Sequence, residues 1–229
     1  MKRTAPMESG KPGGVKAIPL ALVFASDAEK RGWSYGRVTG AGIEPGGLSD
    51  PRIFGHDQDY RCQCNRLVGG TEIDGQVCAN CGVSVGVAAV QQTRRCAHIE
   101  LAAPIQHPWN VDCLFQVLCV VPLRLRSSAR DEAITMRYQR ILELDSRLRR
   151  MIEKKGDSVY DMVRAADSGF RVLHDELQRE VNKLIDGDVG EGHGVSLSTL
   201  LEMEFRRLGE GFLSYARGIG IAFRISTRV

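Results

Sequence analysis

The stretch YRCQCNRLVGGTEIDGQVCANCGV, from Tyr60 to Val83, carries four of the seven cysteines of this 229-residue chain. Their spacing, C-x-C-x13-C-x2-C, suits two tight turns that each present two thiolates, and four thiolates in a tetrahedron are a preferred ligand set of Zn²⁺. Because four cysteines leave no open position for water, the predicted zinc ion is structural rather than catalytic. The alternative is two disulfides or four free thiols. The predicted ligands of this one zinc ion are Cys62, Cys64, Cys78 and Cys81.

Glycines accompany these cysteines where the chain must turn. Gly69, Gly70 and Gly75 give the loop between the two pairs the freedom to fold back, and Gly82, just after the last cysteine, fits the turn that is usual in a zinc knuckle. The segment is too short to build a hydrophobic core of its own. We therefore expect the metal to take the place of that core.

The composition restricts the other functional classes. The net charge of +3 does not demand a nucleic-acid partner, and an aromatic content of 6% argues against stacking platforms for single strands. No stretch approaches the roughly 20 apolar residues of a membrane span, so no membrane partner is expected. The apolar run from Ala17 to Ala25 is too short and too distant from the basic start for a signal peptide. An odd number of cysteines without an export signal then predicts a reducing, cytoplasmic location.

The chain changes character near Ser127. Between Ala129 and Ile185 there is no proline, and apolar residues recur with heptad-like spacing. We expect two antiparallel helices that form a coiled-coil hairpin, joined by a turn at Gly156 and Asp157. A last helix is expected at about residues 197–208. The predicted apolar seam comprises Ile134, Tyr138, Ile141, Leu148 and Ile152, then Ala166, Phe170, Leu173, Leu177, Val181 and Leu184.

The region between the cysteines and these helices suggests strands. GVSVGVAAVQQTRR, residues 82–95, alternates loosely as a strand does, AHIELAAPIQHPW begins like a strand, and CLFQVLCVVPLRL is a buried apolar run that stops at Pro122. His98 and His107 are interpreted as structural histidines, and Cys113 and Cys119 as plain buried residues. The expected fold class is α+β: a small zinc ribbon on a mixed base with a long antiparallel helical hairpin.

Several stretches in one order resemble a known family. RGWSYGRV, DPRIFGHDQDYRCQC, GQVCANCGVSV and RRCAHIELAAPIQHPW are similar to the N-terminal region of the beta-prime subunit of bacterial DNA-directed RNA polymerase, over residues 17–109. The resemblance resumes more faintly in LCVVPLRLRS, YQRILELDSRLRRMI, LQREVNKLIDGD and LSTLLEMEFRRLGEGF. Between Trp109 and Val120 the family carries a long segment that this chain lacks. The chain thus resembles a clamp reduced to its base, zinc ribbon and helical hairpin.

The resemblance implies a division of the chain. Residues 1–14 would be a flexible tail, 15–60 the N-terminal part of the clamp base, and 61–83 the zinc ribbon. Residues 84–126 would be the strands and helix of the clamp base, 127–188 the coiled-coil hairpin of clamp helices, and 189–229 a C-terminal helix with a switch-like tail.

The resemblance also implies partners. The paired clamp helices of the family are the docking site for region 2 of sigma factors, and the clamp associates with the beta and other polymerase subunits. Residues 137–155 hold seven basic and three acidic side chains, a stripe that could steer an acidic protein partner, although a merely solvated helix face remains the alternative. A free-standing clamp mimic that sequesters or delivers a sigma factor is the competing interpretation, and a degenerate folded remnant is a third. The predicted partner-binding residues are Arg140, Arg147, Arg149 and Arg150.

Departures from the family limit what is inherited. The family's magnesium-binding aspartate motif is absent from this chain, and Asp186 and Asp188 are expected to line a helix-terminating turn, so the chain should not polymerise RNA by itself. The loop between the cysteine pairs has one base against Glu72 and Asp74, which weakens the expected contact with DNA. The return helix also diverges from the family at its charged positions. The weak nucleic-acid candidates are Arg66, Arg94 and Arg95.

Overall fold

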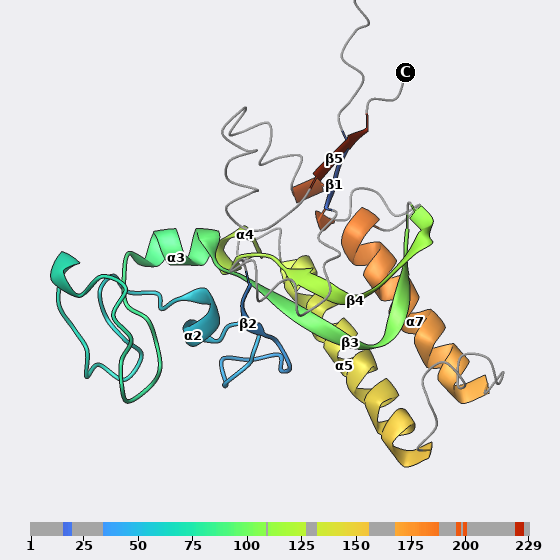
Figure 1. The fold of residues 1–229 in the computed structure, drawn as a ribbon, viewed down its shortest axis with the longest axis horizontal. Helices are drawn as coiled ribbons and strands as arrows, with labels where there is room; N and C mark the ends of the chain where they lie inside the picture. Colours follow the sequence, from blue (N-terminus) through green and yellow to red (C-terminus); the bar gives the residue numbers. More distant parts are fainter. Residues whose placement is uncertain are drawn as a thin grey trace, which may run out of the picture.

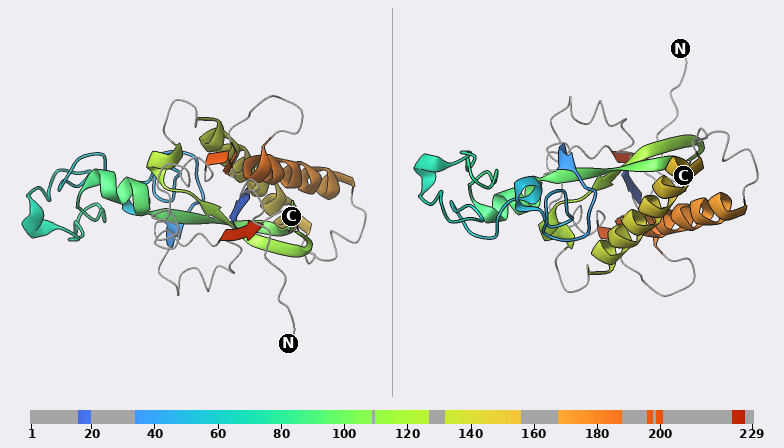
Figure 2. Two further views of the ribbon diagram at one scale, coloured as in Figure 1. Left: turned by 90° about the horizontal axis from the view of Figure 1, so that it is seen from above. Right: turned by 90° about the horizontal axis from the view of Figure 1, so that it is seen from below.

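The computed structural model describes residues 16–19, 34–108, 110–126, 132–155, 168–187, 196, 197, 199, 200 and 223–226. Within them the fold is α+β, as expected. A cysteine-rich loop region lies at one end, a three-stranded sheet lies in the middle, and two long helices lie at the other end (Figures 1 and 2). None of the described helices is both long and apolar enough to span a bilayer.

The central sheet has the order β2-β3-β4 and is dominated by one long hairpin. β3 (Cys96–His107) pairs antiparallel with β4 (Asn110–Val120), and the short β2 (Ser34–Arg37) runs parallel to the start of β3. The strand expected in residues 97–109 and the strand character of the apolar run before Pro122 are both present. Alternate residues along β3 are buried, because α5 and α7 pack against this strand.

The two long helices are α5 (Glu132–Lys155) and α7 (Ser168–Asp186), which contact each other and β3. They run in opposite directions (Figure 1), and ion pairs link Arg137 to Glu180 at 3.8 Å and Arg140 to Glu176 at 2.5 Å. The predicted apolar positions face inward, but Ala166 and the turn at Gly156 lie outside the described residues. Fully or largely buried are Ile134, Tyr138, Ile141, Leu148, Phe170, Leu173, Leu177, Val181 and Leu184.

Side chains of the two helices complete the open edge of β3. The short β2 bonds β3 only as far as His98, whose carbonyl accepts from the N–H of Val38 at 2.7 Å. Further along the same edge, Asp145 of α5 accepts from the N–H of Ala102 at 2.6 Å, and Arg149 donates to the carbonyl of Glu100.

From α7, His174 contacts the carbonyl oxygen of Pro104 at 2.8 Å, and Gln178 makes two hydrogen bonds to the backbone of Gln106, at 2.8 and 2.7 Å. An unpaired strand edge is a template for aggregation. The helices therefore protect this edge as well as covering the sheet.

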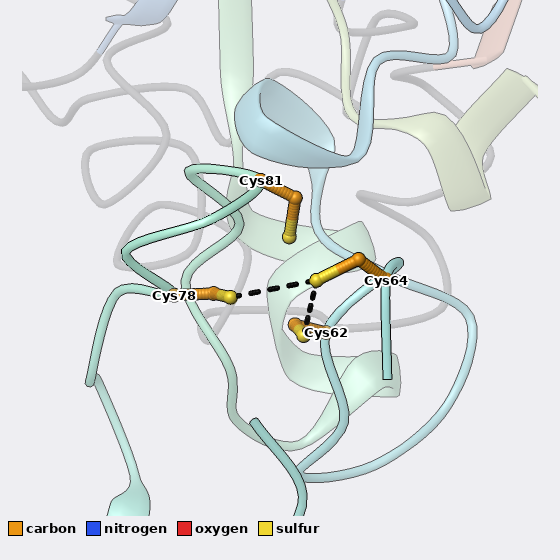
Figure 3. Close-up of side chains that lie close together, drawn as sticks. All are labelled: Cys62, Cys64, Cys78 and Cys81. Atoms are coloured by element: carbon orange, nitrogen blue, oxygen red, sulfur yellow. Dashed lines mark hydrogen bonds between the residues drawn. The ribbon is translucent and has the colours of Figure 1, made fainter. Parts of the chain in front are cut away.

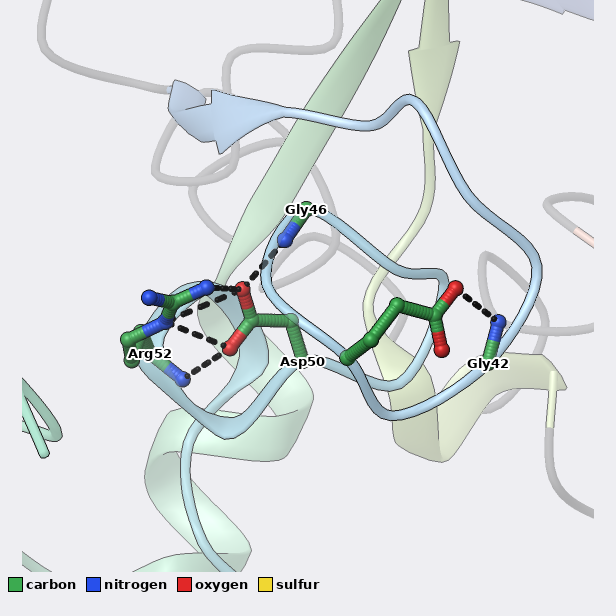
Figure 4. A network of polar contacts seen from close by, with 5 residues as sticks. Gly42, Gly46, Asp50 and Arg52 are labelled. Carbon is green, nitrogen blue, oxygen red and sulfur yellow. Dashed lines mark hydrogen bonds and ion pairs between the residues drawn. The ribbon is translucent and has the colours of Figure 1, made fainter.

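The base of the sheet is fixed by a glycine-rich loop and a short helix, α2 (Pro51–Phe54). Asp50 caps this helix, because its buried carboxylate accepts hydrogen bonds from the N–H groups of Gly46 and Arg52 and from the Arg52 guanidinium (Figure 4). These donors outweigh the effect of burial, which alone would raise the pKa of Asp50, and hold that pKa below its usual range. The loop is thereby tied to the helix that precedes the ribbon.

A second buried charge joins the glycine-rich loop to the end of the hairpin and to α4 (Leu123–Arg126). Arg126 ends α4 and donates to the carbonyls of Val121 and Leu48, at 2.8 and 2.6 Å. Its guanidinium lies 4.5 Å from the centre of the Phe54 ring, and burial lowers the pKa of Arg126 to about 10. The loop, the hairpin and α4 therefore converge on one side chain.

One element differs from its prediction. The strand expected across residues 82–95 is wrong for its second half, because α3 (Ala88–Arg94) is a helix. Its first N–H, from Ala88, is capped by Asp59 at 2.7 Å, a residue far back in the sequence. Val83 and Val85 do alternate toward the interior, but Val77 and Ser84 form only an isolated bridge there. Alanine and glutamine favour a helix once the cap is supplied.

The two ends of the described chain meet. β1 (Lys16–Pro19) and β5 (Phe223–Ser226) pair antiparallel as a separate two-stranded sheet (Figure 1). β5 belongs to the basic C-terminal segment, whose edge is thus paired within the chain. Most of the helix expected at residues 197–208 lies outside the described residues, although Leu197 and Leu200 are buried.

Replacing Gly55 by alanine tests how the base connects to α3. Gly55 ends α2 with φ 92° and ψ 157°, a conformation that essentially only glycine adopts, and an added Cβ would lie 2.6 Å from Cβ of Gln91. We expect Gly55→Ala to lower the free energy of unfolding by about 2 kcal/mol in urea denaturation. Gly75→Ala is the control, because Gly75 also has a positive φ but a Cβ there would meet no atom within 4 Å. If Gly55→Ala and Gly75→Ala lost the same free energy of unfolding, the close approach of the added Cβ to Gln91 would contribute nothing to the loss.

Candidate metal centre

The two cysteine pairs sit in two similar hairpins. In the first, the N–H of Cys62 donates to the carbonyl of Leu67 at 3.0 Å, and Arg61 and Val68 form a bridge. In the second, the N–H of Cys78 donates to the carbonyl of Val83 at 2.9 Å, beside the bridge between Val77 and Ser84. In both hairpins the first cysteine bonds the residue five positions later. Each hairpin thus presents two sulfurs from one tight turn.

Residues with positive φ make the reversals. The N–H of Gly82 donates to the carbonyl of Cys78 at 2.8 Å, and Gly82 has φ 72°, as its place after the last cysteine suggested. In the first hairpin Asn65, with φ 59°, takes the corresponding place. Asparagine tolerates this conformation better than most residues. Between the hairpins the chain turns through a short 3-10 helix, η1 (Thr71–Ile73).

The four cysteines converge on one point. Their Sγ atoms all lie within 4.8 Å of one another, and the side chains point toward a common centre (Figure 3). The Cys62–Cys64 and Cys64–Cys78 sulfur pairs are 3.5 and 3.7 Å apart. A tetrahedron with bonds of about 2.3 Å to zinc has edges of about 3.8 Å between sulfurs. The cluster therefore could hold a metal ion, and its donor set and spacing fit zinc.

The surroundings lower the pKa of Cys62 and Cys64, whereas burial and the two neighbouring sulfurs raise the pKa of Cys78. The N–H of Leu67 donates to Sγ of Cys62 at 3.2 Å. The backbone N–H of Arg66, followed by the side chain of Asn80, lowers the pKa of Cys64 to about 6. Thiolates, not thiols, bind metals, so these donors prepare the site for a cation.

The hydrophobic core around the cluster is small and consists largely of the cysteines themselves. Val83 and Val85 are its fully buried aliphatic residues, with Leu67 and Ile73 partly buried against them. This cluster is separate from the main core of the sheet and helices. So few aliphatic side chains cannot fix two hairpins, which agrees with the expected dependence of this region on metal.

The predicted nucleic-acid residues are not equivalent. Arg66 lies exposed on the first hairpin, and Arg94 lies exposed in the last turn of α3. Arg95 is 8% exposed, with its guanidinium 4.9 Å from the centre of the Tyr35 ring. Only the first two therefore present an open cationic surface.

The predicted partner-binding arginines also divide into two groups. Arg147 and Arg150 are exposed on α5, and Arg150 makes one hydrogen bond, to Ser146 on its own helix. Arg140 is ion-paired with Glu143 and Glu176, and Arg149 is ion-paired with Asp145. These internal pairs could not be seen in the helical spacing of the sequence, because they depend on how α5 meets α7 and β3.

The remaining cysteines and histidines lie in the sheet. Cys96 and Cys119 are buried in the main core, and the side chain of Cys113 lies outside the described residues. His98 and His107 are also buried, and Nδ1 of His98 lies 2.6 Å from Oγ of Ser34. Within the part of the chain that the structure describes, the cluster of possible metal ligands comprises Cys62, Cys64, Cys78 and Cys81.

Comparison with known proteins points in one direction. No family model matches the chain. The chain is 41% identical over 94 residues to the DNA-directed RNA polymerase subunit beta' of Acholeplasma laidlawii, a match that covers 38% of this chain and 7% of that protein. It is 42% identical over 98 residues to the beta' subunits of Lactobacillus delbrueckii subsp. bulgaricus and Limosilactobacillus reuteri, covering 39% of this chain and 8% of each relative.

The chain thus spans less than a tenth of the length of the curated relatives that it matches. The four-cysteine cluster of the structure fits a zinc ribbon, and so agrees with the cysteine motifs that suggested the resemblance. The resemblance predicted from those motifs is confirmed: over about two fifths of its length, this chain is similar to the beta' subunit of DNA-directed RNA polymerase.

Proposed function

We propose that this chain is a transcription protein that works as a reduced clamp module. In this proposal a zinc ribbon with one structural Zn²⁺ is carried on a sheet, and the α5–α7 pair is a coiled-coil hairpin that binds a protein partner. The partner is a sigma factor through its region 2, or the beta and other subunits of RNA polymerase. The module is not catalytic by itself. The observation that carries the proposal is the joint occurrence of the convergent cysteines and the identity to beta' subunits.

The charges on α5 support a protein partner for the hairpin. Arg147 and Arg150 are exposed and form no ion pair among the described residues. Arg140 and Arg149 are already ion-paired within the fold. Arg147 and Arg150 are therefore the part of the basic stripe that is available to a partner. Such a stripe steers an acidic protein surface and mainly affects the rate of encounter and the choice of partner.

Charge reversal of this stripe tests the proposal. Arg147→Glu combined with Arg150→Glu should lower the affinity for the polymerase-associated partner at least about tenfold, because like charges then face each other across the interface. The measurement is pull-down from the native cell with identification of the captured proteins, followed by titration with the purified partner. The matched control is Arg171→Glu with Arg179→Glu, two exposed arginines on α7.

The identity of the captured proteins separates the alternatives. Capture of the beta subunit supports a module that acts within a polymerase, whereas capture of a sigma factor alone supports a free-standing clamp mimic. Capture of neither contradicts both forms of the proposal. Unchanged affinity in the α5 variant, or an equal loss of affinity in the α7 control, would exclude the stripe as the docking surface.

A further inference from the structure

A cleft of about 400 Å³ lies between the ribbon and the base of the fold. One wall comes from the ribbon loop at Asp74, and another from α3 and the residue before it, at Val87 and Val90. Tyr35 of β2 and Arg95, directly after α3, complete the lining. The cleft is thus lined both by the cysteine-rich ribbon and by residues next to the central sheet.

One residue of the cleft lining, Arg95, is a largely buried cation that pairs with no carboxylate of the described residues. Arg95 is 8% exposed, and burial lowers its pKa while the nearby Tyr35 acts in the opposite direction. Among the described residues, no carboxylate pairs with it, and its recorded contact is with the face of the Tyr35 ring. Desolvating a guanidinium without a counter-charge is costly. A carboxylate placed in the cleft would relieve this cost through a bidentate pair.

The rest of the lining indicates what accompanies that carboxylate. Arg94 adds a second cation, and Val87 and Val90 add an apolar wall, of which Val90 is 45% exposed. Tyr35 is 52% exposed and offers further apolar surface. Asp74 stands on the opposite wall, and Glu72 belongs to the same loop. A phosphodiester backbone, with a charge at every nucleotide, would be repelled by these carboxylates more strongly than a single acidic side chain.

We propose that this cleft is a docking site for a polypeptide partner, in which one acidic side chain reaches Arg95 and an adjacent branched apolar side chain packs on Val90. The site is distinct from the basic stripe of α5. It depends on the fold alone, so it stands or fails independently of the clamp-like function.

The probe for this site is N-acetyl-leucyl-glutamate N-methylamide, with the leucyl-glutamine analogue as its matched neutral control. In NMR titrations of the zinc-loaded chain, the glutamate probe should give saturable shifts of the Arg95 Nε–H and of the Val87 and Val90 methyl groups. The glutamine analogue should bind at least tenfold more weakly. Val90→Asp should weaken the glutamate probe to a similar extent, because it adds a second carboxylate, besides that of Asp74, to the lining that holds the two arginines.

Two further variants make the result decisive. Arg95→Gln should remove binding, and its amide spectrum shows whether the fold is retained. Since Val90 is half exposed, Val90→Asp keeps the test valid if Arg95→Gln does not fold. Arg66→Gln on the first hairpin should change nothing. The proposal is overturned if neither probe gives saturable shifts, if both bind equally, or if a single-stranded oligonucleotide displaces the glutamate probe and binds more tightly.

Discussion

Replacing Cys78 by serine is expected to leave the chain nearly free of zinc, whereas the unaltered chain should retain about one ion after dialysis against a competing chelator. The four Sγ atoms lie within 4.8 Å of one another, so loss of one sulfur opens the tetrahedron. The loss should be structural as well. Val83 and Val85 are too few to hold both hairpins once the ion has gone.

The measurement is zinc content by metal analysis, with amide hydrogen exchange at Cys62 and Cys78 as the structural readout. Both amides donate across their hairpins in the folded ribbon and should exchange rapidly in the variant. Cys119→Ser is the control, because Cys119 lies in the main core and not in the cluster. Zinc content close to zero in the unaltered, reduced protein would contradict the metal assignment itself.

The ribbon could be predicted from sequence because its information is local. Four cysteines within twenty residues, and glycine after the last of them, specify two knuckles without reference to the rest of the chain. The two long helices are likewise set by periodic apolar residues, and positions such as Tyr138 and Leu177 are buried as that period requires.

What could not be predicted depends on distant residues. The helix α3 begins where Asp59, and not its own neighbour Val87, supplies the cap, so the local pattern was misleading. The pairing of β3 with β4 and the antiparallel register of α5 against α7 involve contacts that no spacing rule contains. Arg149 is the clearest case. It belongs to a basic run that suggests a partner surface, yet its guanidinium is bound to Asp145 and Glu100.

Asp145→Ala is expected to lower the free energy of unfolding by about 3 kcal/mol, at the upper end of the cost of leaving a buried donor without an acceptor. Asp145 is 4% exposed, and one carboxylate oxygen accepts from the N–H of Ala102 at 2.6 Å. The other oxygen is 2.8 Å from Nε of Arg149. Since Arg149 is partly exposed, the loss should stay below that of breaking a fully buried ion pair.

Two variants separate the parts of this contact in urea denaturation of the zinc-loaded chain. Asp145→Asn keeps an acceptor for Ala102 and loses only the charge, so it should cost less than alanine. Glu143→Ala removes an exposed carboxylate of the same helix and should change stability by less than about 1 kcal/mol. If Asp145→Ala matched Glu143→Ala, and the Ala102 amide stayed protected from exchange, the carboxylate would not be what holds α5 to β3.

Asp145→Asn also bears on function, because it removes the charge that pairs with Arg149. If Arg149 contributes to partner binding only when it is free, Asp145→Asn should bind the proposed acidic partner more tightly than the unaltered chain does. If Arg149 acts by holding α5 on the edge of β3, Arg149→Ala should lower stability while leaving the exposed Arg147 and Arg150 to carry the binding. We expect the second result, since the guanidinium reaches the carbonyl of Glu100 as well as the carboxylate of Asp145. The fold thus holds Arg149 in the contact between α5 and β3, whereas Arg147 and Arg150 of the same basic run stay exposed.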